Sequence, residues 1–417
     1  MKLGKYSFGV GDRFGQQAKA QLQAFIQAKS LGVTITPVWN KSFREHQLIG
    51  SKPEDVRDAA DRAVRALGWK DGYFVDADHI GMKNVDFFLD SSDFFTIDVA
   101  DFIGQPADIK KRALFVEQHK RYLGSLEIPG LAEPLIVTRE QLEAIANKYL
   151  AAIEAAGKIY AYLYSKKSHD GWVVEVSMDE TNSPQTPTEL LFILAGLAQK
   201  EIPLATIAPK FSGRFNKGID YIGDVGQFAT EFAQDLAVIR FAIDEFSLPD
   251  DLKLSVHSGS DKFSIYPVIR RALVQFDAGV HIKTAGTTWL EELIGLAEAG
   301  GDGLSLAKHI YRLAWERFEE LCAPYATVID IHRETLPQPD AVARWDEERF
   351  VTTLRHDVHH PNYNPHFRQL LHVAYKIAAE LGDRYLEALH RYEAQIAKNV
   401  MTNIFERHIQ PIFLPQN

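Results

Sequence analysis

Two aspartates and a histidine stand together at the end of a short segment of β-forming residues, 73–75. Asp76, Asp78 and His79 follow it, and Gly81 then interrupts the pattern. On a strand, Asp76 and Asp78 point to one face, and His79 points to the other unless the strand is already turning. A carboxylate beside an imidazole is suited to act as a base and as a metal ligand. The alternative is that Asp78 caps the next segment and His79 is a structural loop histidine.

Three later segments carry chemically capable groups in similar positions. Glu175 interrupts an apolar segment, where a carboxylate is costly to bury unless it is paired or used. His257 ends a second such segment, and His281 lies within a third.

Together these residues predict a metal site with an acid and a base beside it. His79, His257 and His281 would offer three neutral nitrogens to a divalent cation and leave positions open for the oxygens of a substrate. Asp78 and Glu175 are then the candidate base and acid on opposite sides of that substrate. Each histidine taken alone is more often structural, so the prediction depends on their lying together.

Further charged residues at or near segment ends are candidates for binding the substrate. The chain has a formal net charge of −10, so an anionic substrate would need fixed cations. Residues 211–224, rich in glycine and charge, are typical of a substrate loop and equally of a plain surface loop. The candidates are Asp12, Lys41, Lys210, Arg214, Asp261, Lys262 and Lys283.

The elements that must position these residues are eight predicted strands, most of them alternating with amphipathic helices. This alternation favours an α/β fold, a (β/α)₈ barrel, whose active sites lie at the carboxyl ends of the strands. A doubly wound open sheet is the alternative fold, but the chain shows no phosphate loop. The predicted strands are 6–10, 33–38, 73–81, 94–98, 172–180, 202–208, 253–257 and 280–284.

The spacing of the strands also predicts the domain organisation. Residues 1–288 would form the barrel, and residues 289–417, which have helical patterns, would form an extension packed on it. Residues from about 102 to 170 are more than a strand connection needs, so we expect an inserted helical cap or subdomain there.

A second histidine cluster lies in the predicted extension. His356, His359 and His360 have a spacing that could supply metal ligands from one helical turn. They are equally a loop ahead of Pro361, and no cysteine or glutamate with a zincin spacing accompanies them. We treat this segment as the alternative metal site.

Composition excludes several classes of function. The chain has 417 residues, 46% of them hydrophobic, which is enough for a large core. Its acidic balance and lack of a basic run make nucleic acid an unsuitable partner. Its longest apolar run, 190–198, is too short to span a membrane. The single cysteine excludes an intrachain disulfide framework and suits a reducing compartment, so we expect a cytoplasmic protein; an oligomer is left open.

The glycines near the start of the chain do not form a nucleotide site. Gly9, Gly11 and Gly15 almost match the dinucleotide fingerprint, but the last gap is one residue too long and no acidic residue ends the next strand. We therefore expect no nicotinamide cofactor.

Six segments, 76–80, 211–224, 255–267, 281–287, 356–360 and 405–408, carry a resemblance that extends along nearly the whole chain. In these segments the sequence resembles the tagaturonate epimerase family. The resemblance implies a divalent-metal-dependent enzyme, and the sequence leaves the metal open among Zn, Mn, Ni and Fe. It also implies that this enzyme interconverts D-tagaturonate and D-fructuronate by inverting C4, in hexuronate breakdown. The site residues named above come mainly from the strand argument.

The implied reaction favours a retro-aldol hypothesis. The C4 proton is β to the C2 ketone, so it is not acidified directly. A base could instead take the proton of the C4 hydroxyl, the C3–C4 bond would break, and the aldehyde would re-add from its other face, with the metal stabilising the enediolate. Transient oxidation at C4 is the competing mechanism, and it would require a nicotinamide.

Two other functions remain open from the sequence. One is a metal-dependent aldolase or sugar isomerase acting on a related ketose; the other is a carbohydrate-binding protein that is not an enzyme. In each case the expected partner is a small sugar acid or ketose.

Overall fold

The computed structural model describes residues 2–415 apart from 169, 182 and 284–287, and its centre is a closed barrel of eight parallel strands. The strands run around the barrel in the order β1-β10-β9-β8-β7-β4-β3-β2. The predicted (β/α)₈ barrel is thus confirmed. The strands are β1 (Tyr6–Gly11), β2 (Thr36–Ser42), β3 (Phe74–Ile80), β4 (Phe94–Asp98), β7 (Val173–Ser177), β8 (Leu204–Ala208), β9 (Lys253–His257) and β10 (Val280–Lys283).

Each predicted strand has a counterpart, with small shifts at the ends. β2 begins three residues later than the predicted 33–38 and runs on to Ser42, so Lys41 lies inside it. Thr284, the last residue of the predicted eighth strand, lies outside the described residues. Most strands end within one residue of the predicted position, while β2 ends later and β7 ends earlier than predicted.

Helices surround the barrel, and their first turns carry the capping signals that the sequence shows. Ser42 and Thr186 each form a capping box with a glutamate three residues later. The helices that follow the strands on the outside are α1 (Ala18–Ser30), α2 (Phe43–Ile49), α3 (Pro53–Leu67), α5 (Arg139–Lys166), α6 (Pro187–Gln199), α7 (Val225–Phe246) and α8 (Tyr266–Phe276).

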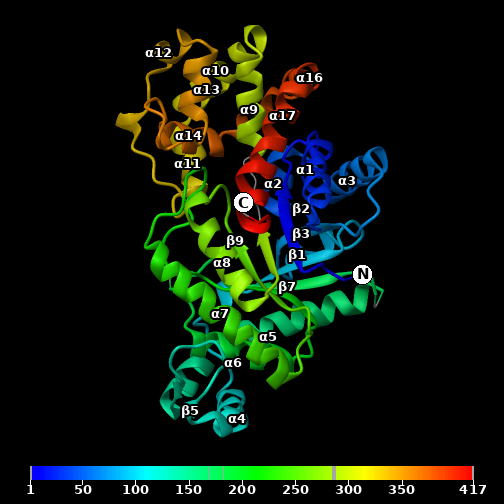
Figure 1. Ribbon diagram of the computed structural model, residues 1–417, viewed down its shortest axis with the longest axis vertical. Helices are drawn as coiled ribbons and strands as arrows, with labels where there is room; N and C mark the ends of the chain where they lie inside the picture. Colours follow the sequence, from blue (N-terminus) through cyan, green and yellow to red (C-terminus); the bar gives the residue numbers. More distant parts are fainter. Residues whose placement is uncertain (1, 169, 182, 284–287, 416–417) are drawn as a thin grey trace.

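The predicted insertion contains both an ordinary barrel helix and an added piece. α5 packs against β4 and α6, so it is the barrel helix between β4 and β7. The added piece is α4 (Ile109–His119) with a hairpin of β5 (Gly124–Leu126) and β6 (Leu135–Val137). It packs on the outside of the barrel helices, where Arg121 pairs with Glu245 of α7. Figure 1 shows it at the opposite end of the molecule from the C-terminal helices.

The chain after the barrel is helical, as predicted, and its end returns to the barrel wall. α17 packs on α9 and α1, and α18 packs on α8, so these last helices fill the space between the first and last barrel helices. A β-carbon at Gly295 of α9 would lie 2.7 Å from Cα of Ile396, which shows how closely α17 approaches. The helices are α9 (Thr288–Glu298), α10 (Gly301–Glu316), α11 (Phe318–Cys322), α12 (Pro339–Ala343), α13 (Glu347–Leu354), α14 (Pro365–Val373), α15 (Tyr375–Leu381), α16 (Asp383–Arg391), α17 (Glu393–Ile404), a π-helical turn (Phe405–Ile409) and α18 (Gln410–Phe413).

The inside of the barrel changes from apolar to polar along the strands. Its lower layer is a small apolar cluster that includes Val38, Phe74 and Phe94. Because side chains alternate along a strand, the residues two positions further on, such as Asp76 after Phe74 and Thr96 after Phe94, also point inward. The upper layers of the barrel are therefore lined by charged and hydroxyl groups.

Within the described residues, none of the helices combines the length and the apolar character needed to cross a membrane.

Candidate active site at the mouth of the barrel

His79 turns toward the mouth because the end of β3 is irregular. The pairing of β3 with β4 shifts register between Ala77 and Ile80, and His79 has a φ of 53°. A bulge combined with a left-handed residue re-aims a side chain, at a cost in backbone energy. His79 therefore joins Asp78 at the mouth, although regular alternation would place the two on opposite faces.

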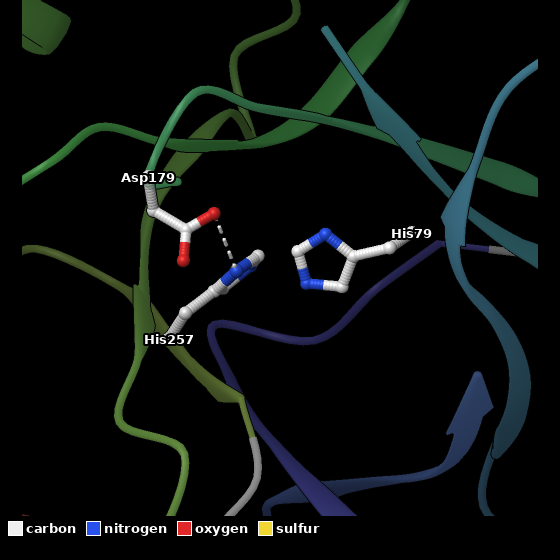
Figure 2. Close-up of side chains that lie close together, drawn as sticks. All are labelled: His79, Asp179 and His257. Carbon is white, nitrogen blue, oxygen red and sulfur yellow. Dashed lines mark ion pairs between the residues drawn. The ribbon is translucent and has the colours of Figure 1, made fainter. Parts of the chain in front are cut away.

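Three side chains converge there, from the ends of three strands. The ligand atoms of His79, Asp179 and His257 all lie within 4.8 Å of one another. Nδ1 of His257 is 3.1 Å from Oδ1 of Asp179, and the rings of His79 and His257 are 5.2 Å apart between centroids. Figure 2 shows the three side chains pointing toward one another. Within the described residues this is the group with the geometry of a metal site.

Each histidine of this group has its other ring nitrogen on a carboxylate. Nε2 of His257 lies 2.7 Å from Oε1 of Glu175, and Nδ1 of His79 lies 3.2 Å from Oδ2 of Asp98. Metal-binding histidines in proteins are commonly held this way, since the carboxylate fixes the tautomer and the ring orientation. The arrangement leaves Nδ1 of His257 and Nε2 of His79 for a cation.

Glu175 lies below the histidines and is fully enclosed. It is 0% exposed, and its second oxygen, Oε2, accepts a hydrogen bond of 2.7 Å from Thr206. Although burial alone would raise it, Lys283 and His257 hold the pKa of Glu175 well below its usual range. Glu175, the predicted acid, is thus placed to orient His257.

Lys283 binds the carboxylates at the centre of the barrel. Its Nζ lies 2.8 Å from Asp76, 2.8 Å from Asp78 and 3.3 Å from Glu175. It also donates to the hydroxyl of Thr96. An ammonium group has three hydrogen-bond donors, and all three are occupied here. Lys283 is therefore placed to position the acids of the barrel, and its assignment to substrate stays a prediction.

The pKa values of the two aspartates beside Lys283 are shifted in opposite directions. Burial, together with Asp78 and Glu175, outweighs Lys283 and raises the pKa of Asp76 to about 6. Against the same burial, Lys283 and His79 lower the pKa of Asp78 from its usual value. Asp78 is therefore an ionised acceptor at the mouth, next to the proposed metal ligands, although its lowered pKa makes it a weaker base than a free aspartate.

His281, the third predicted metal ligand, lies deeper in the barrel. It precedes Lys283 by two residues and so points inward one layer lower, where its Nδ1 lies 2.9 Å from Oγ of Ser7 and its ring packs 5.3 Å from Phe94. Burial lowers the pKa of His281 to about 3. The structure does not bring it into the group with His79 and His257, and Asp179 takes its place.

Asp261 and Lys262 fasten loops together instead of facing the mouth. Nζ of Lys262 contacts the carbonyl oxygens of Asn216 and Ile219 and the hydroxyl of Ser260, at 2.8–3.0 Å. Asp261 is 0% exposed and pairs with Arg368 of α14 at 2.8 Å. Their polar groups have partners within the protein, so their assignment to substrate stays a prediction.

Asp12 and Lys41 also have structural partners. The carboxylate of Asp12 accepts hydrogen bonds from the backbone N–H groups of Gly15 and Gln17, at 2.9 and 2.6 Å. Nζ of Lys41 donates to the carbonyl of Arg13 and the hydroxyl of Ser51, both at 2.7 Å. Both residues line a cavity of about 360 Å³ beside the exits of β1 and β2, which does not include the three converging side chains.

The last two substrate-binding candidates lie after β8. The backbone N–H of Lys210 donates to Oε1 of Gln185 at 2.6 Å, and its side chain is half-buried. Arg214 is half-exposed, 3.5 Å from Asp330. Their assignment to substrate stays a prediction.

The alternative metal segment does not gather its histidines. Nδ1 of His356 lies 3.2 Å from Oδ2 of Asp261, on the same oxygen that Arg368 binds. His359 is exposed, and Nδ1 of His360 accepts from the N–H of Asn362 at 3.1 Å. His356 thus connects the C-terminal extension to the loop after β9.

Two carboxylates of the site, Asp98 and Asp179, are not among the predicted site residues. Asp98 ends β4 and Asp179 follows β7, so both had the signal used for the other residues, a polar group at a strand exit. The predicted strand 172–180 includes Asp179, whereas β7 ends at Ser177, so Asp179 lies just beyond the strand, where alternation does not predict direction.

Comparison with known proteins gives a consistent result. A family model described as tagaturonate epimerase matches residues 1–412. A curated tagaturonate/fructuronate epimerase from Thermotoga maritima is 30% identical over 419 aligned positions, covering 97% of this chain and 80% of the relative.

Solved structures agree with the family match. A glycerol complex of the fructuronate-tagaturonate epimerase from Cohnella laeviribosi has a TM-score of 0.81 at 26% identity, covering 99% of this chain and 82% of that one. The native form of the same protein has a TM-score of 0.80 at 26% identity with the same coverage.

Proposed function

This chain belongs to the tagaturonate epimerase family, and from that premise we propose that it interconverts D-tagaturonate and D-fructuronate with the help of a divalent cation. The observation that carries the proposal is the convergence of His79, Asp179 and His257 at the mouth, with a carboxylate behind each histidine. The cytoplasmic location expected from the sequence stays part of this proposal.

The donor set fits a metal. Nδ1 of His257 is buried and has no hydrogen-bond partner in the described part of the chain, although Asp179 lies within ion-pair distance. Two imidazoles and one carboxylate suit Zn, Mn, Fe or Ni, and they leave positions for substrate oxygens. When bound, such a cation supplies Lewis-acid stabilisation of negative charge on those oxygens.

Asp78 is the residue that we assign as the base. Its carboxylate is held ionised by Lys283 at 2.8 Å and lies 3.6 Å from Nε2 of His79, at the edge of the proposed metal site. It takes the proton of the C4 hydroxyl as the C3–C4 bond breaks, so that C4 becomes an aldehyde and the bonding electrons pass to an enediolate at C2 and C3. After the aldehyde turns, the bond re-forms on its other face and Asp78 returns the proton.

Lys283 and Glu175 support this step without touching the substrate. Lys283 neutralises part of the charge of three acids in the barrel, and Glu175 holds the ring of His257. Such preorganised charges cost no rearrangement when the reaction occurs.

The test is an assay of metal-stripped protein with each sugar acid, with and without added Mn²⁺, Zn²⁺, Ni²⁺ or Fe²⁺, followed by product NMR. We expect added metal to restore interconversion in the wild-type protein. His257→Ala should abolish this activity, and His359→Ala, in the alternative segment, should retain it. Loss of metal binding in His359→Ala with retention in His257→Ala would move the site to the extension.

The same NMR spectra separate the other functions and mechanisms. Free three-carbon fragments would indicate an aldolase, and an aldose would indicate an isomerase. Binding without turnover, with every metal, would indicate a carbohydrate-binding protein. Solvent deuterium at C4 would contradict the retro-aldol step, since that step never breaks the C4–H bond.

A further inference from the structure

A group of cations lies beside the proposed active site with few acids to balance it. We call Arg13, Arg44 and Lys217 the cationic cluster. Arg13 pairs with Glu45 at 3.1 Å. Within the described residues, neither Arg44 nor Lys217 has a carboxylate oxygen within ion-pair distance. Among the described residues, Glu45 is thus the one acid that forms an ion pair with the cluster, in a chain whose formal net charge is −10.

The cluster is held together by two tyrosines of the C-terminal extension. The guanidinium carbon of Arg13 lies 4.5 Å from the ring centroid of Tyr375. That of Arg44 lies 4.8 Å from the ring of Tyr325, and Nζ of Lys217 lies 5.8 Å from the same ring. The two tyrosine hydroxyls are 2.7 Å apart. Aromatic faces attract cations but cancel none of their charge.

Strand pairing places the cluster next to the proposed base. Oε2 of Glu45 accepts a hydrogen bond of 3.1 Å from the N–H of Ser42, the last residue of β2. Ser42 is the pairing partner of Asp78 in β3. Arg13, through Glu45, therefore lies beside the end of β2, the strand next to the acid that we assign to the C4 hydroxyl.

A buried histidine provides an independent sign of a missing partner. His372 of α14 is 2% exposed, and in the part of the chain that the structure describes neither of its ring nitrogens has a hydrogen-bond partner. It packs beside the cluster, since a β-carbon at Gly218 would lie 3.2 Å from Cβ of His372. Burial and then the charges of Arg13 and Lys217 hold the pKa of His372 well below its usual value. Unpaired buried polar groups are costly, and a ligand would satisfy them.

We propose that the cationic cluster, with His372, binds the carboxylate of the sugar acid while the barrel mouth holds its ketone and hydroxyls. This inference rests on the proposed function, and it names the feature that would select uronates over neutral ketoses. Three cations with a single ion pair among them suit an anionic ligand, and a guanidinium can bind a carboxylate through two hydrogen bonds.

The test measures binding separately from turnover. D-Gluconate carries the carboxylate but has no ketone to convert, and D-glucitol is its neutral counterpart. Calorimetry on metal-loaded protein should show gluconate binding that Lys217→Gln weakens about 10-fold or more, and Arg44→Gln, at the exposed rim, weakens less. Lys217→Arg should restore part of the affinity, and Lys19→Gln, an exposed lysine on α1, should leave it unchanged.

The outcomes separate this inference from the proposed function. Wild-type turnover of D-tagaturonate combined with an unchanged KM and unchanged gluconate affinity in Lys217→Gln would overturn the carboxylate site alone. Gluconate binding no tighter than glucitol binding would overturn it as well. Selective gluconate binding by a wild-type protein that turns over neither uronate would keep the carboxylate site and overturn the epimerase assignment.

Discussion

Glu175 lies directly behind His257, with Oε1 of the carboxylate 2.7 Å from Nε2 of the imidazole and both side chains enclosed by the barrel. This contact decides which nitrogen of His257 faces Asp179. A glutamate inside an apolar strand is thereby explained as the group that orients a metal ligand.

The first prediction concerns this orientation. Glu175→Gln keeps the shape of the side chain and removes the charge that stabilises the ring, so metal affinity should fall about 10- to 100-fold. Competition with a chelator of known affinity measures the change. Glu143→Gln, an exposed change on α5, is the control. Equal metal affinity in Glu175→Gln and wild type would show that Glu175 does not support the site.

The second prediction concerns the backbone of His79. At its φ of 53°, a residue with a β-carbon is strained and glycine is not. His79→Gly and His79→Ala both remove the imidazole, so their difference reports the backbone. We expect the glycine variant to be more stable by about 1 kcal/mol in urea unfolding of metal-free protein.

The neighbouring position supplies the matched control for that comparison. Ala77 lies in the regular, buried part of β3, so Ala77→Gly should lose stability rather than gain it. An alanine variant at position 79 as stable as the glycine variant would show that the bulge stores no strain.

The fold was predictable because its signals are local. Each strand of the barrel is a short apolar segment that ends in polar groups, and no information from distant parts of the chain is needed to see it. The helical extension after β10 was predictable for the same reason.

The site was predictable only in part because its details depend on distant contacts. The direction of His79 follows from a register shift against β4, which the sequence of β3 does not contain. Asp261 and Lys262 were expected at the mouth, but Arg368, 107 residues beyond Asp261, occupies the first, and the loop 211–224 occupies the second. Charged residues at strand exits therefore predict the place of a site better than its members.

The third prediction concerns the pair of Asp261 and Arg368, both 0% exposed. Arg368 also donates to the carbonyls of Gly218 and Leu354, so it joins the barrel loops to the extension. Arg368→Met leaves the carboxylate of Asp261 buried without its main partner and should cost about 3–5 kcal/mol of unfolding free energy.

A double-mutant cycle checks the cause of that loss. Adding Asp261→Asn to Arg368→Met removes the stranded charge, so the double variant should regain part of the stability that Arg368→Met loses. Urea unfolding measures all four proteins. Strictly additive losses would show that the two residues do not stabilise the fold through their ion pair.

The last prediction concerns Glu291 of α9, which is 2% exposed and has one carboxylate oxygen without a hydrogen-bond partner in the described structure. Burial, only partly offset by Arg368 and Arg355, raises the pKa of Glu291 from 4.5 to about 7. Between these two values the folded chain keeps a proton that the unfolded chain has released, so this group lowers stability as the pH rises. Glu291→Gln should therefore stabilise the protein by up to about 3 kcal/mol at pH 8 and by about 1 kcal/mol at pH 5. Unfolding free energies at the two pH values measure this, with the exposed Glu319→Gln as control, and an equal gain at both would show that Glu291 does not titrate with a raised pKa.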